Sequence, residues 1–160
     1  MEFRASLDKF MIIMTFSLVS LLIFLPVLIH FFVDAPYILI MSLIGLLLNV
    51  ILFFFAPKSY LVEAGKLTIN KGIGQKLYDL SGVKEIRLAE KDELRYSLRT
   101  LGVGGFLGDF GMFWVKSLGS MTWYCTKKSN YIIIRLKDNK IIVITPDEVE
   151  SCLLALQNAQ

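Results

Sequence analysis

The sequence predicts a membrane-anchored α+β protein, in which a two-helix transmembrane hairpin precedes a small domain of short strands capped by a C-terminal α-helix. Three observations lead to this prediction: two long apolar runs near the N-terminus, a series of short β-prone segments after them, and an amphipathic segment at the end. The composition agrees, because 55% of the residues are hydrophobic and the mean hydropathy is +0.61. These values are too high for an ordinary soluble domain of this size.

The two apolar runs are residues 10–32 and 37–56. Each has about the length that an α-helix needs to cross the hydrocarbon core of a bilayer. Only four residues, 33–36, separate them, so the chain turns back without room for a domain on the far side. A cleaved signal peptide is the alternative for the first run. That run is too long for a typical signal core and lacks a small-x-small cleavage site before the second run.

Polar residues inside the two runs mark where the helices are expected to touch. If the chain folds back at the middle of the short turn, Ser20 and Asn49 lie at nearly the same depth, and Gly45 lies near Phe24. An unpaired amide is costly in hydrocarbon, so Asn49 should face the other helix or another subunit. Ser20, Gly45 and Asn49 are therefore predicted to form a helix contact, not a transport pathway.

Basic residues near the runs predict the orientation. Arg4 and Lys9 precede the first run and Lys58 and Lys66 follow the second, whereas the turn has none. The positive-inside rule then places both termini in the cytoplasm of a bacterial cell, at the inner membrane. The expected divisions are a cytoplasmic tail, the hairpin and a cytoplasmic domain, and their bounds are 1–9, 10–56 and 57–160.

Short β-prone runs fill the domain and indicate a sandwich or barrel of about seven strands. The clearest hairpin pairs residues 131–136 with 140–145 across the turn Lys137-Asp138-Asn139. The other runs expected to form strands are 60–63, 67–70, 75–80, 83–88 and 120–126.

The chain is predicted to end in a helix. Thr145 is placed to act as N-cap and Pro146 to take the first helical position, and acidic residues follow where the helix dipole favours them. An apolar stripe at helical spacing should lie across the sheets. Its members are Val149, Cys152, Leu153 and Leu156.

The chemistry-bearing residues argue against an enzyme or a metalloprotein. The chain has two cysteines, Cys125 and Cys152, and one histidine, His30, which lies in the first apolar run. This leaves too few ligands for a zinc site and no nucleophile–base pair, so neither a metal nor a cofactor is expected. In residues 57–160, fifteen Lys and Arg face eleven Asp and Glu, a net charge of +4. That surplus suits a domain beside an anionic leaflet and is far from a nucleic-acid signature.

The most unusual stretch, residues 99–114, combines five glycines with four aromatic residues. Its glycine spacing does not match a nucleotide-binding fingerprint. It is expected to form a loop of defined shape, which either packs against the bilayer or the domain or binds a ligand or partner. Arg99 is expected either to cap carbonyls of the loop or to meet a phosphate. The candidate site residues are Arg99, Gly102, Gly104, Gly105, Phe106, Gly108, Asp109, Phe110, Gly111 and Phe113.

This glycine–aromatic pattern, a following strand that ends Tyr124-Cys125-Thr126, a β-hairpin and Thr145-Pro146-Asp147 together resemble the bacterial PH-like (pleckstrin homology-like) domain family. The resemblance is to membrane-tethered members with an N-terminal transmembrane hairpin. It implies a strongly bent, seven-stranded antiparallel barrel closed by a C-terminal helix, with binding and not catalysis as its activity.

We therefore expect a membrane-tethered binding or assembly module whose partners are the lipid bilayer and a protein partner or a second copy of the chain. Contact with anionic lipid headgroups is a further expectation, and it would involve Lys66, Lys71 and Lys76. The alternative is a lipid or small-ligand sensor with a pocket between the glycine–aromatic loop and the terminal helix. An exposed apolar patch or sheet edge would favour assembly, and an enclosed pocket would favour sensing.

Overall fold

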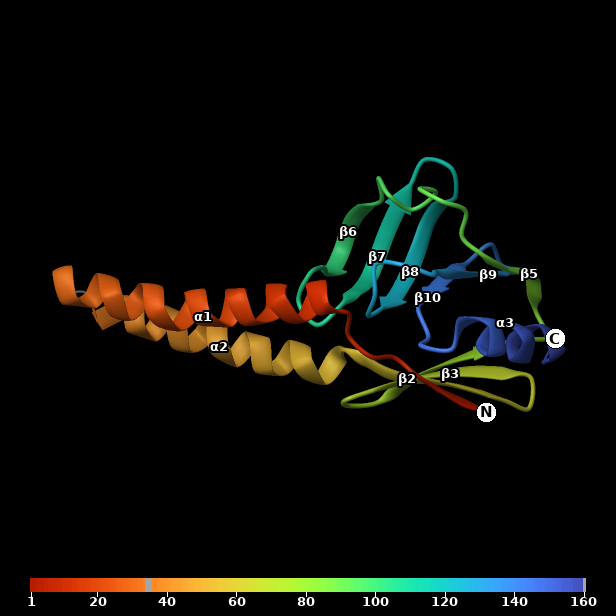
Figure 1. Cartoon of the computed structure of the whole chain (residues 1–160), viewed down its shortest axis with the longest axis horizontal. Coiled ribbons are helices and arrows are strands. Elements are labelled where there is room, and N and C mark those ends of the chain that lie inside the picture. Colours follow the sequence, from red (N-terminus) through yellow and green to blue (C-terminus); the bar gives the residue numbers. More distant parts are fainter. Residues whose placement is uncertain (34–35, 160) are drawn as a thin grey trace.

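The computed structural model describes residues 1–33 and 36–159. Two long helices extend from a β-rich domain of two sheets and a terminal helix (Figure 1). The strands are β1 (Glu2–Arg4), β2 (Pro57–Glu63), β3 (Lys66–Lys71), β4 (Gln75–Asp79), β5 (Val83–Leu88), β6 (Leu98–Val103), β7 (Asp109–Val115), β8 (Gly119–Cys125), β9 (Ile132–Leu136) and β10 (Ile141–Ile144). The helices are α1 (Lys9–Phe32), α2 (Pro36–Phe55) and α3 (Val149–Asn158).

The two predicted apolar helices are present as α1 and α2, which pack side by side (Figure 1). At 1.5 Å per residue they are about 36 Å and about 30 Å long, so both are long enough to cross a membrane. Asp8 caps the start of α1, because its Oδ1 accepts a hydrogen bond from the Met11 N–H at 2.7 Å. The predicted turn includes Asp34 and Ala35, which lie outside the described residues.

The first sheet has the order β1-β2-β3-β4, and the N-terminal residues expected to form a tail supply its first strand. Phe3 pairs with Tyr60 in the antiparallel register of β1 and β2. Because β1 and β2 are neighbours in space, α1 and α2 form an insertion between two paired strands. Both ends of the helical hairpin therefore meet the same sheet.

The second sheet has the order β5-β9-β10-β8-β7-β6. The predicted hairpin of residues 131–136 and 140–145 is confirmed as β9 and β10, and Ile133 pairs with Val143. The expectation that all strands are antiparallel is wrong at one place, because β10 and β8 run parallel, with Val143 opposite Trp123. Strands β1, β6 and β7 were not expected, so the structure exceeds the predicted seven strands.

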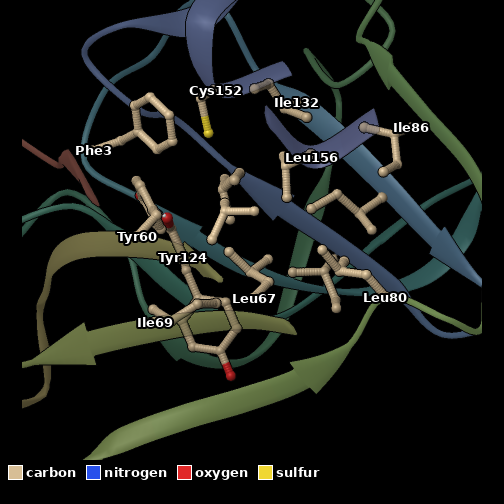
Figure 2. Packing of buried hydrophobic residues seen from close by; sticks show 14 of the residues in the cluster. Phe3, Tyr60, Leu67, Ile69, Leu80, Ile86, Tyr124, Ile132, Cys152 and Leu156 are labelled. Atoms are coloured by element: carbon tan, nitrogen blue, oxygen red, sulfur yellow. Dashed lines mark hydrogen bonds between the residues drawn. The ribbon is translucent and has the colours of Figure 1, made fainter. Parts of the chain in front are cut away.

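The two sheets pack across a core that α3 closes at one end (Figure 2). Tyr60 and Leu67 project from the first sheet, and Ile132 from the second, toward Cys152 and Leu156 of α3. All five side chains are fully buried. The predicted apolar stripe of the terminal helix is therefore confirmed. The sheets form a sandwich, and the closed barrel that the resemblance implied is not formed.

Thr145 is not the N-cap of the terminal helix. The helix begins at Val149, and Glu148 is its cap residue without a side-chain capping bond. Thr145 Oγ1 instead accepts hydrogen bonds from the N–H groups of Thr126 at 2.9 Å and Lys127 at 3.3 Å. Its side chain is buried, so it satisfies backbone groups of a neighbouring strand end, which a local capping rule does not consider.

Both cysteines are buried in the domain, as expected of small core residues. Burial raises the pKa of the Cys152 thiol to about 12 and also raises the pKa of Cys125. Neither thiol is therefore poised to act as a nucleophile near neutral pH.

Candidate binding surface

The glycine–aromatic stretch is a β-hairpin and not the predicted loop. Strands β6 and β7 pair in antiparallel register, and residues 104–108 connect them; we call this connection the hairpin tip. The register contains a bulge between Arg99 and Leu101. Glycines weaken strands in general, so the composition alone favoured a loop.

Two of the glycines are required because the strands approach each other closely at one pair. Gly102 and Gly111 are directly opposite, with φ of 127° and 126°. A Cβ on either residue would lie only 2.3 Å from a carbonyl oxygen of the other strand. These glycines allow the two strands to approach each other this closely.

The hairpin tip docks on the helical hairpin. The Leu107 N–H donates to Thr15 Oγ1 at 3.1 Å, and the same hydroxyl donates to the Met11 carbonyl at 2.8 Å. Thr15 lies six residues into α1, about 9 Å along its axis. Phe106 and Leu107 are buried in a small cluster with residues of both helices (Figure 1 shows the turn between β6 and β7 at the end of α1). The other members and neighbours of that cluster are Ala56, Phe110, Leu7, Val19, Leu52 and Val103.

Arg99 and Asp109 hold the shape of the hairpin tip. The Arg99 guanidinium donates to the Gly104 carbonyl at 3.4 Å, which is one of the two roles considered for it, and Asp109 Oδ1 accepts from the Gly105 N–H at 3.0 Å. Asp109 is buried, and burial raises the pKa of its carboxyl although the positive charge of Lys128 opposes the shift. Both side chains are thus engaged with the tip backbone.

A second contact ties the domain to α2. The turn between β3 and β4 approaches the end of this helix, where the Ile73 N–H donates to the Phe54 carbonyl at 2.8 Å. A Cβ on Gly72 would lie 2.8 Å from the Phe54 Cα. Asp8 ties α1 in the same way, because its Oδ2 accepts from the Lys128 N–H at 3.0 Å. The domain therefore holds the ends of both helices through several backbone contacts.

One face of β6 and β7 is apolar and open. Cross-strand partners share a face, and here they are Leu98 with Trp114 and Leu101 with Met112. These four side chains, which we call the exposed apolar face, are 63%, 41%, 69% and 45% exposed in that order. Among the described strands β6 has one neighbour, β7, so its outer edge is unpaired. It is the strand of the second sheet nearest to the helical hairpin (Figure 1).

The opposite face of β7 is covered. Phe113 is buried and stacks on Trp123 with ring centroids 4.4 Å apart. Leu94, in the segment between β5 and β6, packs over the same cluster. Glu93 secures that segment by a paired contact with Arg87, at 2.6 and 2.8 Å. Phe113 therefore contributes to the core and does not reach the surface.

The predicted contact between α1 and α2 is formed by different partners from those expected. Gly45 faces Leu22, whose Cδ2 would lie 3.4 Å from a Cβ at that position, and Ser42 Oγ donates to the Leu22 carbonyl. The Asn49 amide donates to the Gly45 carbonyl of its own helix at 2.7 Å. Ser20 is exposed.

The residues of the exposed apolar face were missed by sequence reasoning, and the signal for them was weak. Met112 and Trp114 alternate with buried residues, as in a half-covered strand, but the flanking glycines hid the pattern. The pairing that brings Leu98 and Leu101 beside them depends on a bulge, which the sequence did not indicate.

The hairpin tip lines a groove with the two helices and not with α3. The groove has a volume of about 430 Å³. Its lining residues are Leu7, Ile12, Thr15, Phe16, Val19, Leu46, Asn49, Val50, Phe53, Phe54, Phe106 and Leu107. Helix α3 packs instead on β5 and β2. The structure thus gives no support to the pocket expected between the glycine–aromatic segment and the terminal helix.

The three lysines considered for lipid contact are divided between the two ends of the first sheet. Lys71 and Lys76 flank the turn that contacts α2, and the Lys71 ammonium lies 5.4 Å from the ring centroid of Tyr124. Burial lowers the pKa of Lys71, and the charge of Lys76 adds to that shift. Lys66 pairs with Asp79 at the opposite end of the same strands.

Comparison with known proteins identifies the family of the β-rich domain. A family model described as bacterial PH domain matches residues 58–160, which are the strands from β2 onward and α3. No curated protein and no solved structure gives a match. The matched range is most of the chain and covers the two-sheet domain except for β1, and its family is one of binding modules. The chain therefore belongs to the bacterial PH domain family.

Proposed function

We propose that this protein is a membrane-anchored assembly module, in which α1 and α2 span the bilayer and the PH-like domain binds another protein at the cytoplasmic face. The single observation that carries the proposal is the exposed apolar face beside the unpaired edge of β6. A large apolar patch on a folded domain marks an interaction surface. The proposed binding mode is strand addition, in which a partner strand pairs with β6 and its side chains cover Leu98 and Leu101.

The link between domain and helices supports anchoring in the membrane. A signal peptide cleaved after α1 would remove β1, whose Phe3 is buried in the core, and the Thr15 hydroxyl that holds the hairpin tip. If α1 is not cleaved off, the two helices also put both chain ends on the same side of the membrane. Arg4, Lys9 and Lys58 lie on that side, which favours the cytoplasm by the positive-inside rule.

The firm attachment gives the domain a fixed orientation. Contacts at Thr15, Asp8 and Phe54 hold it against the helices from different elements. A partner held in the same membrane therefore meets β6 at a defined height above the bilayer. Restricting both partners in this way raises their effective concentration, which favours binding through a modest surface.

The test is position-specific photo-crosslinking of the full-length protein in its native membranes. A photoreactive residue in place of Leu101 is expected to give a discrete crosslinked species, which the additional change Met112→Glu removes. The control position is Leu154 of α3, which is 59% exposed and lies away from β6. Equal crosslinking from the two positions, or none from position 101, contradicts the proposal. A species twice the mass of the chain identifies a second copy as the partner.

A further inference from the structure

Within the described parts of the chain, no side chain fills the groove between α1, α2 and the hairpin tip. Its lining spans Ile12 to Val19 on α1 and Leu46 to Phe54 on α2, and Phe106 and Leu107 close it on the domain side. In a bilayer this volume is bounded on its open side by lipid chains and not by water.

The groove offers almost nothing to a polar ligand. Thr15 and Asn49 are the two lining residues with polar side chains. The Thr15 hydroxyl donates to the Met11 carbonyl and accepts from Leu107, and the Asn49 amide donates to Gly45. The remaining lining side chains are aliphatic or aromatic, so an unbranched hydrocarbon chain is the ligand chemistry that fits.

A positive charge stands beside the domain end of the groove. The Lys58 ammonium lies 5.4 Å from the ring centroid of Phe53, which lines the groove. Lys58 is the second residue of β2, three residues after the end of α2, which puts it near the level of the lipid phosphates if α2 spans the bilayer.

We propose that the groove binds one phospholipid, with an acyl chain between α1 and α2 beneath the hairpin tip and the phosphate beside Lys58. The inference rests on the proposed membrane insertion of the helices and is independent of any partner at β6. Anionic lipids should be preferred, because basic side chains near a membrane surface favour them by roughly fivefold each, or about 1 kcal/mol.

The experiment is native mass spectrometry of the full chain purified in detergent, after exchange into phosphatidylglycerol or phosphatidylethanolamine of equal chain length. The wild type should retain one lipid, with about fivefold more phosphatidylglycerol than phosphatidylethanolamine. Val50→Trp, which fills the groove, should lose both lipids. The matched control is Ile51→Trp on the same helix, which does not line the groove. Phe16→Ala removes one wall and should also weaken retention, which guards against a folding defect specific to the tryptophan variant.

The headgroup is tested separately. Lys58→Gln should retain lipid but lose the preference for phosphatidylglycerol, whereas Lys66→Gln at the distal end of β3 should behave as wild type. Equal retention by wild type and Val50→Trp, or no lipid on the wild type, overturns the inference. Carbonate extraction of the native membrane reports separately on insertion: a protein that remains in the membrane but retains no lipid contradicts this site alone.

Discussion

The two ends of the β6–β7 hairpin are both apolar, and they differ in what covers them. Phe106 in the hairpin tip and Phe110 beside it in β7 are buried against the ends of α1 and α2. Farther along the same face, Leu101 and Met112 are exposed. The same kind of side chain thus serves packing within the chain at one end and remains without a cover at the other. The type of residue alone therefore does not distinguish a structural element from a binding surface. The distinction depends on whether other parts of the chain cover the side chains.

The largest expected effect comes from Gly108, which links the hairpin tip to the sheet. Its φ is 124°, and a Cβ would lie 2.4 Å from the Cys125 carbonyl oxygen. Gly108→Ala should therefore destabilise the protein by about 3 kcal/mol or more. Thermal unfolding in detergent measures this. Gly82→Ala, where a Cβ meets open space, is the matched control and should change stability little.

Truncation at the tip should cost more than truncation on the exposed apolar face. Phe106→Ala removes a buried ring from the contact with the helices and should cost about 3 kcal/mol. Leu101→Ala removes an exposed side chain and should stay within about 0.5 kcal/mol. Unfolding curves of the two variants provide the comparison. Similar losses of stability would mean that the exposed apolar face is covered within the purified protein.

Changes in the exposed apolar face should weaken binding of the partner but leave the stability of the folded protein nearly unchanged. Trp114→Ala is expected to reduce the yield of the position-101 crosslink by at least tenfold, because truncated interface aromatics often cost about 2 kcal/mol. The same variant should unfold at nearly the wild-type temperature. Unchanged crosslinking by a folded Trp114→Ala protein would argue that the face is not the contact surface.

Asp109 should make the stability of the folded protein depend on pH in a defined direction. Burial raises the pKa of its carboxyl in the folded state, so its protonated form is favoured there. The stabilisation linked to this protonated carboxyl is fully present below the pKa of Asp109 in the unfolded state, about 3.9. It is lost as pH rises through the higher pKa of Asp109 in the folded state. Asp109→Asn keeps an acceptor for Gly105 and should unfold at a higher temperature than wild type, by a margin that grows with pH.

A control distinguishes this effect from a general response to pH. Asp138 is exposed, and its pKa is lowered by the hydrogen bonds from Lys140 and the charge of that residue. Asp138→Asn should therefore show a small effect of opposite sign, with its loss of stability shrinking as pH falls. A margin for Asp109→Asn that does not change between pH 4 and 8 would contradict the effect of burial.

The smallest expected effect concerns the cysteines. Cys125 and Cys152 are buried, and burial raises the pKa of both thiols. A thiol reagent at pH 8 should therefore label neither residue in the folded protein within minutes and both in denaturant. Fast labelling of the native protein would show that the core opens between the sheets.

Sequence reasoning succeeded where one local rule determines the structure. Long apolar runs predicted α1 and α2, and the turn around Asp138 predicted the hairpin of β9 and β10. Periodicity also predicted the apolar face of α3 through Cys152 and Leu156. In each case the signal lies within one segment of the chain.

Sequence reasoning failed where distant segments decide the structure. The short strand β1 gains its place by pairing with β2, more than fifty residues away, and nothing local marks Phe3 as a core residue. Gly102 and Gly111 form one cross-strand pair, so the reason for a glycine at either position is the closeness of the other strand. The residues predicted for the candidate site lie on or beside this hairpin, but which side chains it exposes depends on the register.

Hydrogen exchange of the full-length protein, followed by mass spectrometry of the β6–β7 peptides, tests the comparison most directly. In purified protein in lipid nanodiscs, the tip amides such as Leu107 should exchange slowly, and the outward amides of β6 should exchange fast. In native membranes the β6 amides should become protected while the tip stays unchanged. Fast exchange at the tip in nanodiscs, or no added protection of β6 in native membranes, would contradict the account.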